Sequence, residues 1–348
     1  MIPKKILSFG VGVFLAILVS GCGKAANEKT GAEGATPAAA LPAIPLGLDQ
    51  LKIPADNPMT PEKVELGKLL YFDKRLSKDG TISCATCHDP TKAWAENEPT
   101  STGIKHLVGG RNSPTVINAA YLPVQFWDGR AATLEEQALG PIENPIEMGN
   151  AMPIVVEDLG KIGDYKERFQ KVFGTGVTKE GLAKAIAAFE RTILSGDSPY
   201  DRFKGGDKGA LSEEAKRGME VFMDKAECKL CHAPPIFTNG GFYNAGVDAQ
   251  KEKPDEGRKK VTGKDEDMGK FRVAPLREVA STAPYFHDGS AAKLEDAVEL
   301  MASGGKDNPH LSAMMKSVRD AKLTDQDKKD LVAFLKALSG KYPVVTPP

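Results

Sequence analysis

The sequence has no excess of positive charge, since 46 lysines and arginines face 47 acidic residues among its 348 residues, a formal net charge of −1. Such a chain lacks the phosphate-neutralising charge that nucleic-acid binding needs, so we expect no nucleic-acid partner. Aromatic residues make up only 7% of the chain, which predicts that something besides Phe and Trp fills its cores. The 41% of hydrophobic and 27% of charged residues are nevertheless typical of a folded globular protein.

Cysteine is also scarce, with five residues in the chain, but four of them form a pattern. They lie in two C-x-x-C-H strings, Cys84–His88 and Cys228–His232, and this string is the attachment signal for c-type haem. Cysteines at this spacing lie on one side of a helical turn and can both bond the haem vinyl groups, and the next residue binds the iron. A redox dithiol or half of a zinc site are the alternatives.

The second copy of the motif favours haem over both alternatives, because no further Cys/His pair completes a zinc cluster. The sequence therefore predicts two covalent haem c groups and two proximal iron ligands. The expected thioether residues and ligands are Cys84, Cys87, Cys228, Cys231, His88 and His232.

The remaining cysteine, Cys22, follows a short leader. Lys4 and Lys5 precede an apolar run too short for a membrane span, and Ser20-Gly21 forms a small-residue cleavage site. This pattern resembles a bacterial lipoprotein signal, with residues 1–21 removed, Cys22 lipidated and residues 22–47 forming a flexible, anchored tether. Plain secretion with an unmodified Cys22 is the alternative. Both predict export, and the first predicts a membrane-anchored periplasmic protein.

The rest of the chain repeats itself. Residues 126–136 match residues 286–296 at a constant offset of 160, and each haem motif follows a similar apolar segment. We therefore expect two similar haem domains, residues 48–205 and residues 206–348.

Both halves show helical periodicity. Leu182, Ile186, Phe189 and Ile193 form one apolar stripe, and a second stripe is formed by Leu331, Phe334, Leu335 and Leu338. Thr60, Ser212 and Thr324 are expected helix starts, and no alternating run is long enough for a substantial sheet. The predicted fold is mainly α, as two cytochrome c-type domains related by internal duplication.

The two halves differ where a second iron ligand is expected. Met301 precedes Ser303-Gly304-Gly305 and is our predicted axial ligand of the second haem, with core packing as the alternative and Met268 as the next candidate. The position 160 residues before Met301 is Pro141, which has no ligating atom. The first haem therefore lacks the ligand that the second has.

Five strings resemble those of bacterial di-haem cytochrome c peroxidases across nearly the whole mature length. They are SCATCH at 83–88, GRNSPT at 110–115, QFWDGR at 125–130, FMDK at 222–225 and APYFH at 283–287. The resemblance implies a low-potential peroxidatic haem in the first domain and a high-potential electron-transfer haem in the second.

The resemblance also implies individual roles. His106 corresponds to the distal ligand that leaves the first iron on activation, Glu147 and Gln137 to polar residues of the peroxide pocket, and Trp127 to a tryptophan between the haems. Calcium ligands between the domains are implied at Asn112, Thr282 and Pro284. Taken without the resemblance, His106 fits a surface loop, Glu147 a solvated carboxylate and Trp127 interface packing.

The leading functional expectation is a periplasmic peroxidase that reduces hydrogen peroxide with electrons from a small c-type cytochrome or similar donor. An electron relay between membrane donors and small cytochromes is the alternative. A related di-haem oxidase that modifies a partner protein fits less well, because those relatives carry Tyr where this chain has Met301. The family is commonly dimeric, so a homodimer is an expectation from the resemblance alone. His287 is read as a haem-propionate or interface residue, and His310 has no expected role.

Overall fold

The computed structural model describes residues 43–348. The expected signal peptide, Cys22 and the tether as far as residue 42 lie outside the described residues. Within the described part, no helix has the length and apolar character needed to cross a membrane.

Helices dominate the described residues, as expected. One short antiparallel ladder joins β1 (Phe242–Tyr243) to β2 (Phe271–Arg272), with Phe242 opposite Arg272. The helices are α1 (Pro61–Phe72), α2 (Cys84–Cys87), α3 (Leu134–Glu143), α4 (Met152–Gly160), α5 (Gly163–Phe173), α6 (Lys179–Glu190), α7 (Pro199–Lys204), α8 (Glu213–Glu220), α9 (Lys259–Thr262), α10 (Leu294–Ala302), α11 (Met314–Asp320) and α12 (Asp325–Lys336).

The three expected helix starts are confirmed. The hydroxyl of Thr60 accepts a hydrogen bond from the backbone N–H of Lys63 at 3.2 Å, and Ser212 caps α8 in the same way. Thr324 and Asp327 form a capping box at the start of α12. Each side chain satisfies a backbone donor that the first helical turn leaves free.

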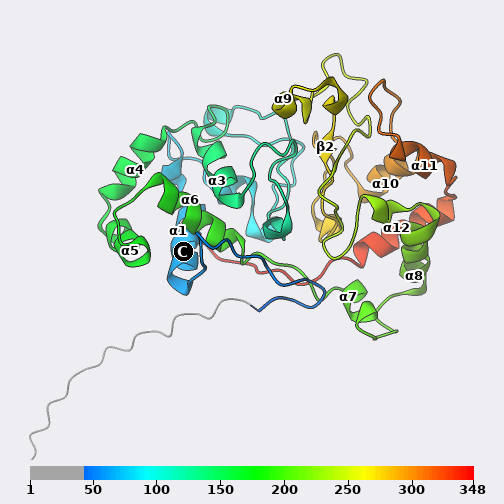
Figure 1. Cartoon of the computed structure of the whole chain (residues 1–348), viewed down its shortest axis with the longest axis horizontal. Coiled ribbons are helices and arrows are strands. Elements are labelled where there is room, and N and C mark those ends of the chain that lie inside the picture. The colour runs from blue at the N-terminus through cyan, green and yellow to red at the C-terminus, as the bar shows by residue number, and fades with distance from the viewer. Residues whose placement is uncertain (1–42) are drawn as a thin grey trace, which may run out of the picture. The chain divides into compact units, whose positions relative to one another are not determined.

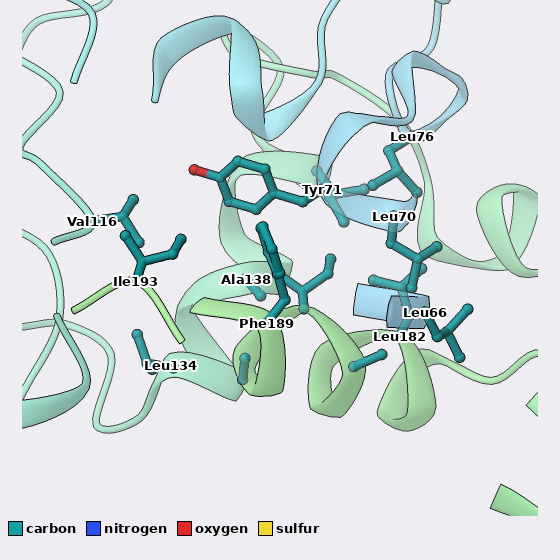
Figure 2. Close-up of a cluster of buried hydrophobic side chains, with 14 of the residues drawn as sticks. Leu66, Leu70, Tyr71, Leu76, Val116, Leu134, Ala138, Leu182, Phe189 and Ile193 are labelled. Atoms are coloured by element: carbon teal, nitrogen blue, oxygen red, sulfur yellow. The ribbon is translucent and has the colours of Figure 1, made fainter. Parts of the chain in front are cut away.

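The core of the N-terminal half, residues 48–205, forms where α1 and α6 lie side by side (Figure 1). Figure 2 shows the edge of Tyr71 from α1 facing Phe189 from α6, with ring centroids 5.2 Å apart. All four members of the expected stripe on and after α6 are buried, at Leu182, Ile186, Phe189 and Ile193. The helical periodicity in this segment is therefore confirmed.

A separate core forms in the C-terminal half, residues 206–348, where α8 lies beside α12 (Figure 1). A π-helical turn at Val221–Lys225 continues α8 and buries Phe222 against Phe334 of α12, with ring centroids 5.1 Å apart. The second expected stripe is buried as well, at Leu331, Phe334, Leu335 and Leu338.

Local features recur between the halves at the offset of 160 residues. The isolated bridge between Gln125 and Ala131 has a counterpart between Tyr285 and Ala291. Asn118 and Glu278, both with positive φ, each precede a 3₁₀ turn, at Ala119–Tyr121 and Val279–Ser281.

The two ends of the described chain cross the expected boundary between residues 205 and 206. The indole N–H of Trp94 in the N-terminal half donates to the carbonyl of Pro343 at 2.8 Å. The guanidinium of Arg277 in the C-terminal half donates to the carbonyl of Gly47, the last residue of the expected tether, at 3.0 Å. The boundary stays a prediction, and the halves are tied together by both chain ends.

In each of the two helix pairs, α1 with α6 and α8 with α12, one glycine lies at the point of closest approach. A Cβ added at Gly67 of α1 would lie 1.9 Å from the carbonyl oxygen of Ala185, and one at Gly218 of α8 would lie 1.9 Å from that of Asp330. The helices therefore approach each other so closely that only a residue without a side chain fits at these crossings.

We predict that Gly67→Ala destabilises the protein by about 1–3 kcal/mol, because backbone atoms must move to admit the methyl group. The matched control is Gly160→Ala in α4, where an added Cβ meets no atom within 4 Å. Thermal unfolding should show a lowered midpoint for the first variant alone. Equal midpoints would contradict the close crossing of α1 and α6.

Candidate functional site

A cavity of about 340 Å³ lies in the C-terminal half, and the second haem-attachment motif lines it. Cys228, Cys231, His232 and Met301 all contribute to its wall. Met268 does not, whereas Met314 and Met315 of α11 do. The expected ligand set is therefore brought together, and the structure favours Met301 over Met268. Met314 and Met315 were not predicted to line the haem cavity, because nothing in their local sequence connects them to the haem motif.

His232 is held in an orientation suited to binding iron. Its Nδ1 hydrogen-bonds to the carbonyl of Phe237 at 3.0 Å, so with the proton on Nδ1 the lone pair of Nε2 is available to a metal. Burial lowers the pKa of His232, which keeps the imidazole neutral. A neutral ring is the form that coordinates metals.

The N-terminal motif forms the short helix α2, at whose start the hydroxyl of Thr86 accepts from the backbone N–H of Ser83 at 3.0 Å. Burial lowers the pKa of His88 to about 4, and its Nδ1 is buried without a hydrogen-bond partner among the described residues. Cys84 packs against the N-terminal core. None of the four motif cysteines is engaged in a disulfide, so both motifs present the groups that attach a c-type haem.

His106 lies on the surface in a tight loop. The backbone N–H of Gly103 donates to the carbonyl of Leu107 at 2.8 Å, and that of Gly109 donates to Ser101 at 2.7 Å. His106 itself is exposed, with φ +58°. The loop is attached to the expected peroxide pocket, because the N–H of Ile104 donates to the carbonyl of Glu147 at 2.8 Å.

Glu147 is a partly buried carboxyl group rather than a solvated one. The amide of Asn144 donates to its Oε1 at 2.7 Å. Burial raises the pKa of Glu147, and the positive charge of Arg130 opposes that shift. Gln137 lies half-buried on α3, and no hydrogen bond between the described residues joins it to Glu147.

Arg130 is a site residue that sequence reasoning missed. Its guanidinium stacks on the ring of Phe126, 3.5 Å from the centroid, and pairs with Asp128 at 3.1 Å. The only signal was its place in the QFWDGR string. Through its charge, it acts on the same carboxyl group that we expect to move protons.

Trp127 lies where the two halves meet. Its indole N–H donates to the carbonyl of Asn112 at 2.9 Å, and its own carbonyl accepts from the backbone N–H of Arg272 at 2.8 Å. Trp127 also lines the C-terminal cavity. A position between the halves is what the expected inter-haem role requires.

The three expected calcium ligands line the same C-terminal cavity as the second haem motif. Asn112, Thr282 and Pro284 all contribute to its wall. The amide nitrogen of Asn112 donates to the carbonyl of Glu98 at 2.8 Å, which leaves its Oδ1 to accept or coordinate. No group of three or more His, Cys, Asp or Glu side chains in the described part could hold a metal, so an ion here would depend on amide and carbonyl oxygens.

The remaining two histidines are His287 and His310, to which the sequence assigned no single role. His287 is buried, stacks on Phe271 with ring centroids 3.6 Å apart, and places Nε2 3.4 Å from Asp248. Its carbonyl accepts from the backbone N–H of Asn112 at 2.7 Å, and His287 also lines the C-terminal cavity, so both expected roles stay predictions. His310 is exposed.

The family model described as di-haem cytochrome c peroxidase matches residues 61–209. The chain is 41% identical to the cytochrome c551 peroxidase of Pseudomonas aeruginosa, over 84% of this chain and 83% of that protein. It is 36% identical to the methylamine utilization protein MauG of Methylorubrum extorquens, over 99% of both chains. The chain therefore belongs to the di-haem cytochrome c peroxidase family.

Membership confirms the expected enzyme class, an oxidoreductase of the cytochrome c peroxidase type, and implies two c-type haems. Among solved structures, a MauG-like protein associated with microbial copper homeostasis aligns with a TM-score of 0.77 and 32% identity, over 86% of this chain and 95% of that one. The diheme peroxidase BthA from Burkholderia thailandensis has the same fold, with a TM-score of 0.69 at 24% identity over 82% of this chain and 87% of that one.

We predict that Met301→His lowers the higher of the two haem potentials, because an imidazole stabilises ferric iron relative to a thioether. Met268→Leu is the control, since Met268 does not line the cavity. Spectroelectrochemical titration of the haem-loaded protein measures both potentials. An unchanged upper potential in Met301→His would assign the ligand elsewhere, with Met314 and Met315 next to be tested.

Proposed function

We propose that this protein reduces hydrogen peroxide to water at the N-terminal haem, with electrons from a small c-type cytochrome or similar donor entering at the C-terminal haem. The observation that carries the proposal is the difference between two corresponding helix positions. Met301 of α10 faces the C-terminal cavity, whereas the corresponding position in α3 is Pro141. A haem attached at Cys84 and Cys87 would therefore receive no thioether from this position of α3, which favours substrate binding there.

Glu147 is the proposed proton shuttle. A bound haem would supply the electrons, while the chain has to move a proton between the two oxygens of peroxide, from the one that stays to the one that leaves. A leaving hydroxide in a pocket shielded from water is otherwise costly. A carboxyl group whose pKa is raised by burial can both take and return that proton. Gln137 is proposed to orient peroxide through its amide.

His106 is proposed to be the ligand that leaves the N-terminal iron. His106 lies exposed in a surface loop, and a ligand that leaves the iron needs such room to move, which supports this role. Because Ile104 bonds to the backbone of Glu147, a movement of this loop would also reposition the proposed shuttle. Opening and proton transfer are then coupled through one hydrogen bond.

The broader assignments belong to the same proposal. We propose export to the periplasm with a lipid anchor at Cys22, a homodimer, and an internal duplication of residues 48–205 and 206–348. The recurring bridges and turns at the 160-residue offset support the duplication. A calcium ion held by Asn112 Oδ1 and the carbonyls of Thr282 and Pro284 is proposed between the halves.

Glu147→Gln is predicted to lower peroxidase turnover by about 10²–10⁴, the usual contribution of a positioned acid–base group. Both haem spectra and the release of His106 on half-reduction should be unchanged. Glu143→Gln is the matched control, because Glu143 is an exposed carboxylate at the end of α3. Steady-state peroxide reduction would check this. Near-normal turnover in Glu147→Gln would move the shuttle to another residue, and donor oxidation without peroxide would then favour the electron relay.

Removal of calcium is predicted to alter both the haem spectra and peroxide turnover, since the ion would bind beside the contact between Asn112 and His287. Chelation followed by calcium addition should be reversible, and magnesium addition should not restore the spectra, because Mg²⁺ needs a smaller, octahedral site. A chelator that changes neither spectra nor activity would show that no functional calcium is bound.

A further inference from the structure

Arg272 is a buried arginine that pairs with no carboxylate in the described part of the chain. Only 3% of the residue is exposed. Its guanidinium makes two long hydrogen bonds, both of 3.3 Å and both to backbone carbonyls, those of Phe126 and Val273. The other buried arginines differ, since Arg277 pairs with Asp201 at 2.7 Å and Arg191 pairs with Glu135 at 2.8 Å.

An unpaired buried cation is unfavourable. Removing a guanidinium from water costs free energy that neutral carbonyls recover only in part, and buried charges are therefore normally paired. Burial alone lowers the pKa of Arg272 to about 10, with no neighbouring carboxylate to raise it again. The position calls for an anion that no described side chain supplies.

The position of Arg272 in the fold indicates where that anion comes from. Arg272 ends β2 and lines the same cavity as Cys228, Cys231, His232 and Met301. Its backbone N–H is bonded to the carbonyl of Trp127, so it also lies at the contact between the halves. A haem attached to these cysteines carries two propionate carboxylates, and the planar guanidinium suits bidentate binding of a carboxylate.

We infer that Arg272 binds a propionate carboxylate of the haem attached at Cys228 and Cys231, and holds it beside Trp127. The inference rests on the proposed haem site of the C-terminal half. Neutralising a propionate removes negative charge near the iron and so favours the ferrous state. Arg272 then acts with Met301 to keep this haem at high potential.

The test compares the potentials of both haems in the full-length holoprotein, measured without peroxide, for wild type, Arg272→Gln and Arg272→Lys. Arg217→Gln is the charge-matched control, because the Arg217 side chain is 50% exposed on α8 and pairs with Asp330. We expect Arg272→Gln to shift the second haem toward ferric iron by about tenfold, which for one electron is about 59 mV. Its propionate bending band should also move in the resonance Raman spectrum.

Arg272→Lys should retain most of the wild-type potential, because it keeps the charge, and Arg217→Gln should change neither readout. Should Arg272→Gln fail to retain the second haem, retention by Arg272→Lys supports the same conclusion. The inference is overturned by an Arg272→Gln protein with wild-type potential and Raman band, or by an Arg272→Lys protein that behaves like Arg272→Gln. Since no peroxide is added, absent peroxidase activity would contradict the proposed function alone.

Discussion

The hydrogen bonds around Asn112 are the contact on which the relation between the two haem sites depends. Its carbonyl accepts from the indole of Trp127, and its N–H donates to the carbonyl of His287. Trp127 and His287 occupy corresponding positions, 160 residues apart. One residue thus bonds to both members of a repeated pair, and its hydrogen bond to His287 crosses from one half to the other.

Charge strengthens the same contact. Arg111, next to Asn112, pairs with Asp128 of its own half at 2.7 Å and with Asp255 of the other half at 2.6 Å. The guanidinium holds the pKa of Asp255 well below its usual range, so this carboxylate stays ionised throughout the neutral pH range. Ion pairs of this kind, partly withdrawn from water, are screened less than surface pairs. The junction beside Trp127 therefore combines directional hydrogen bonds with a persistent electrostatic link.

Local sequence was enough to predict α1, α6, α8 and α12, because their caps and apolar stripes are local signals. Thr324 caps α12 through Asp327 three residues later, and the stripe through Phe189 follows helical periodicity. The haem motifs are equally local, since both cysteines and the histidine come from one turn. Pairings between distant segments could not be predicted. The charge of Arg130 acts on Glu147 because the fold brings these two side chains close together. Arg277 pairs with a carboxylate and Arg272 does not, and this difference also arises only from the fold.

The two sites also differ in the charged group that each one contains, and this difference suits their proposed tasks. Near the N-terminal site, Glu147 is only partly buried and accepts a hydrogen bond from Asn144, and burial raises its pKa while the charge of Arg130 opposes that shift. In the C-terminal cavity the buried cation Arg272 lies at the end of β2, beside apolar and thioether groups. Proton transfer needs a carboxyl group near its titration point, whereas electron transfer needs a charge that does not change during the cycle. A repeated scaffold can thus support both tasks, because exchanging a few side chains alters the electrostatics while the helix pairs built on Gly67 and Gly218 stay the same.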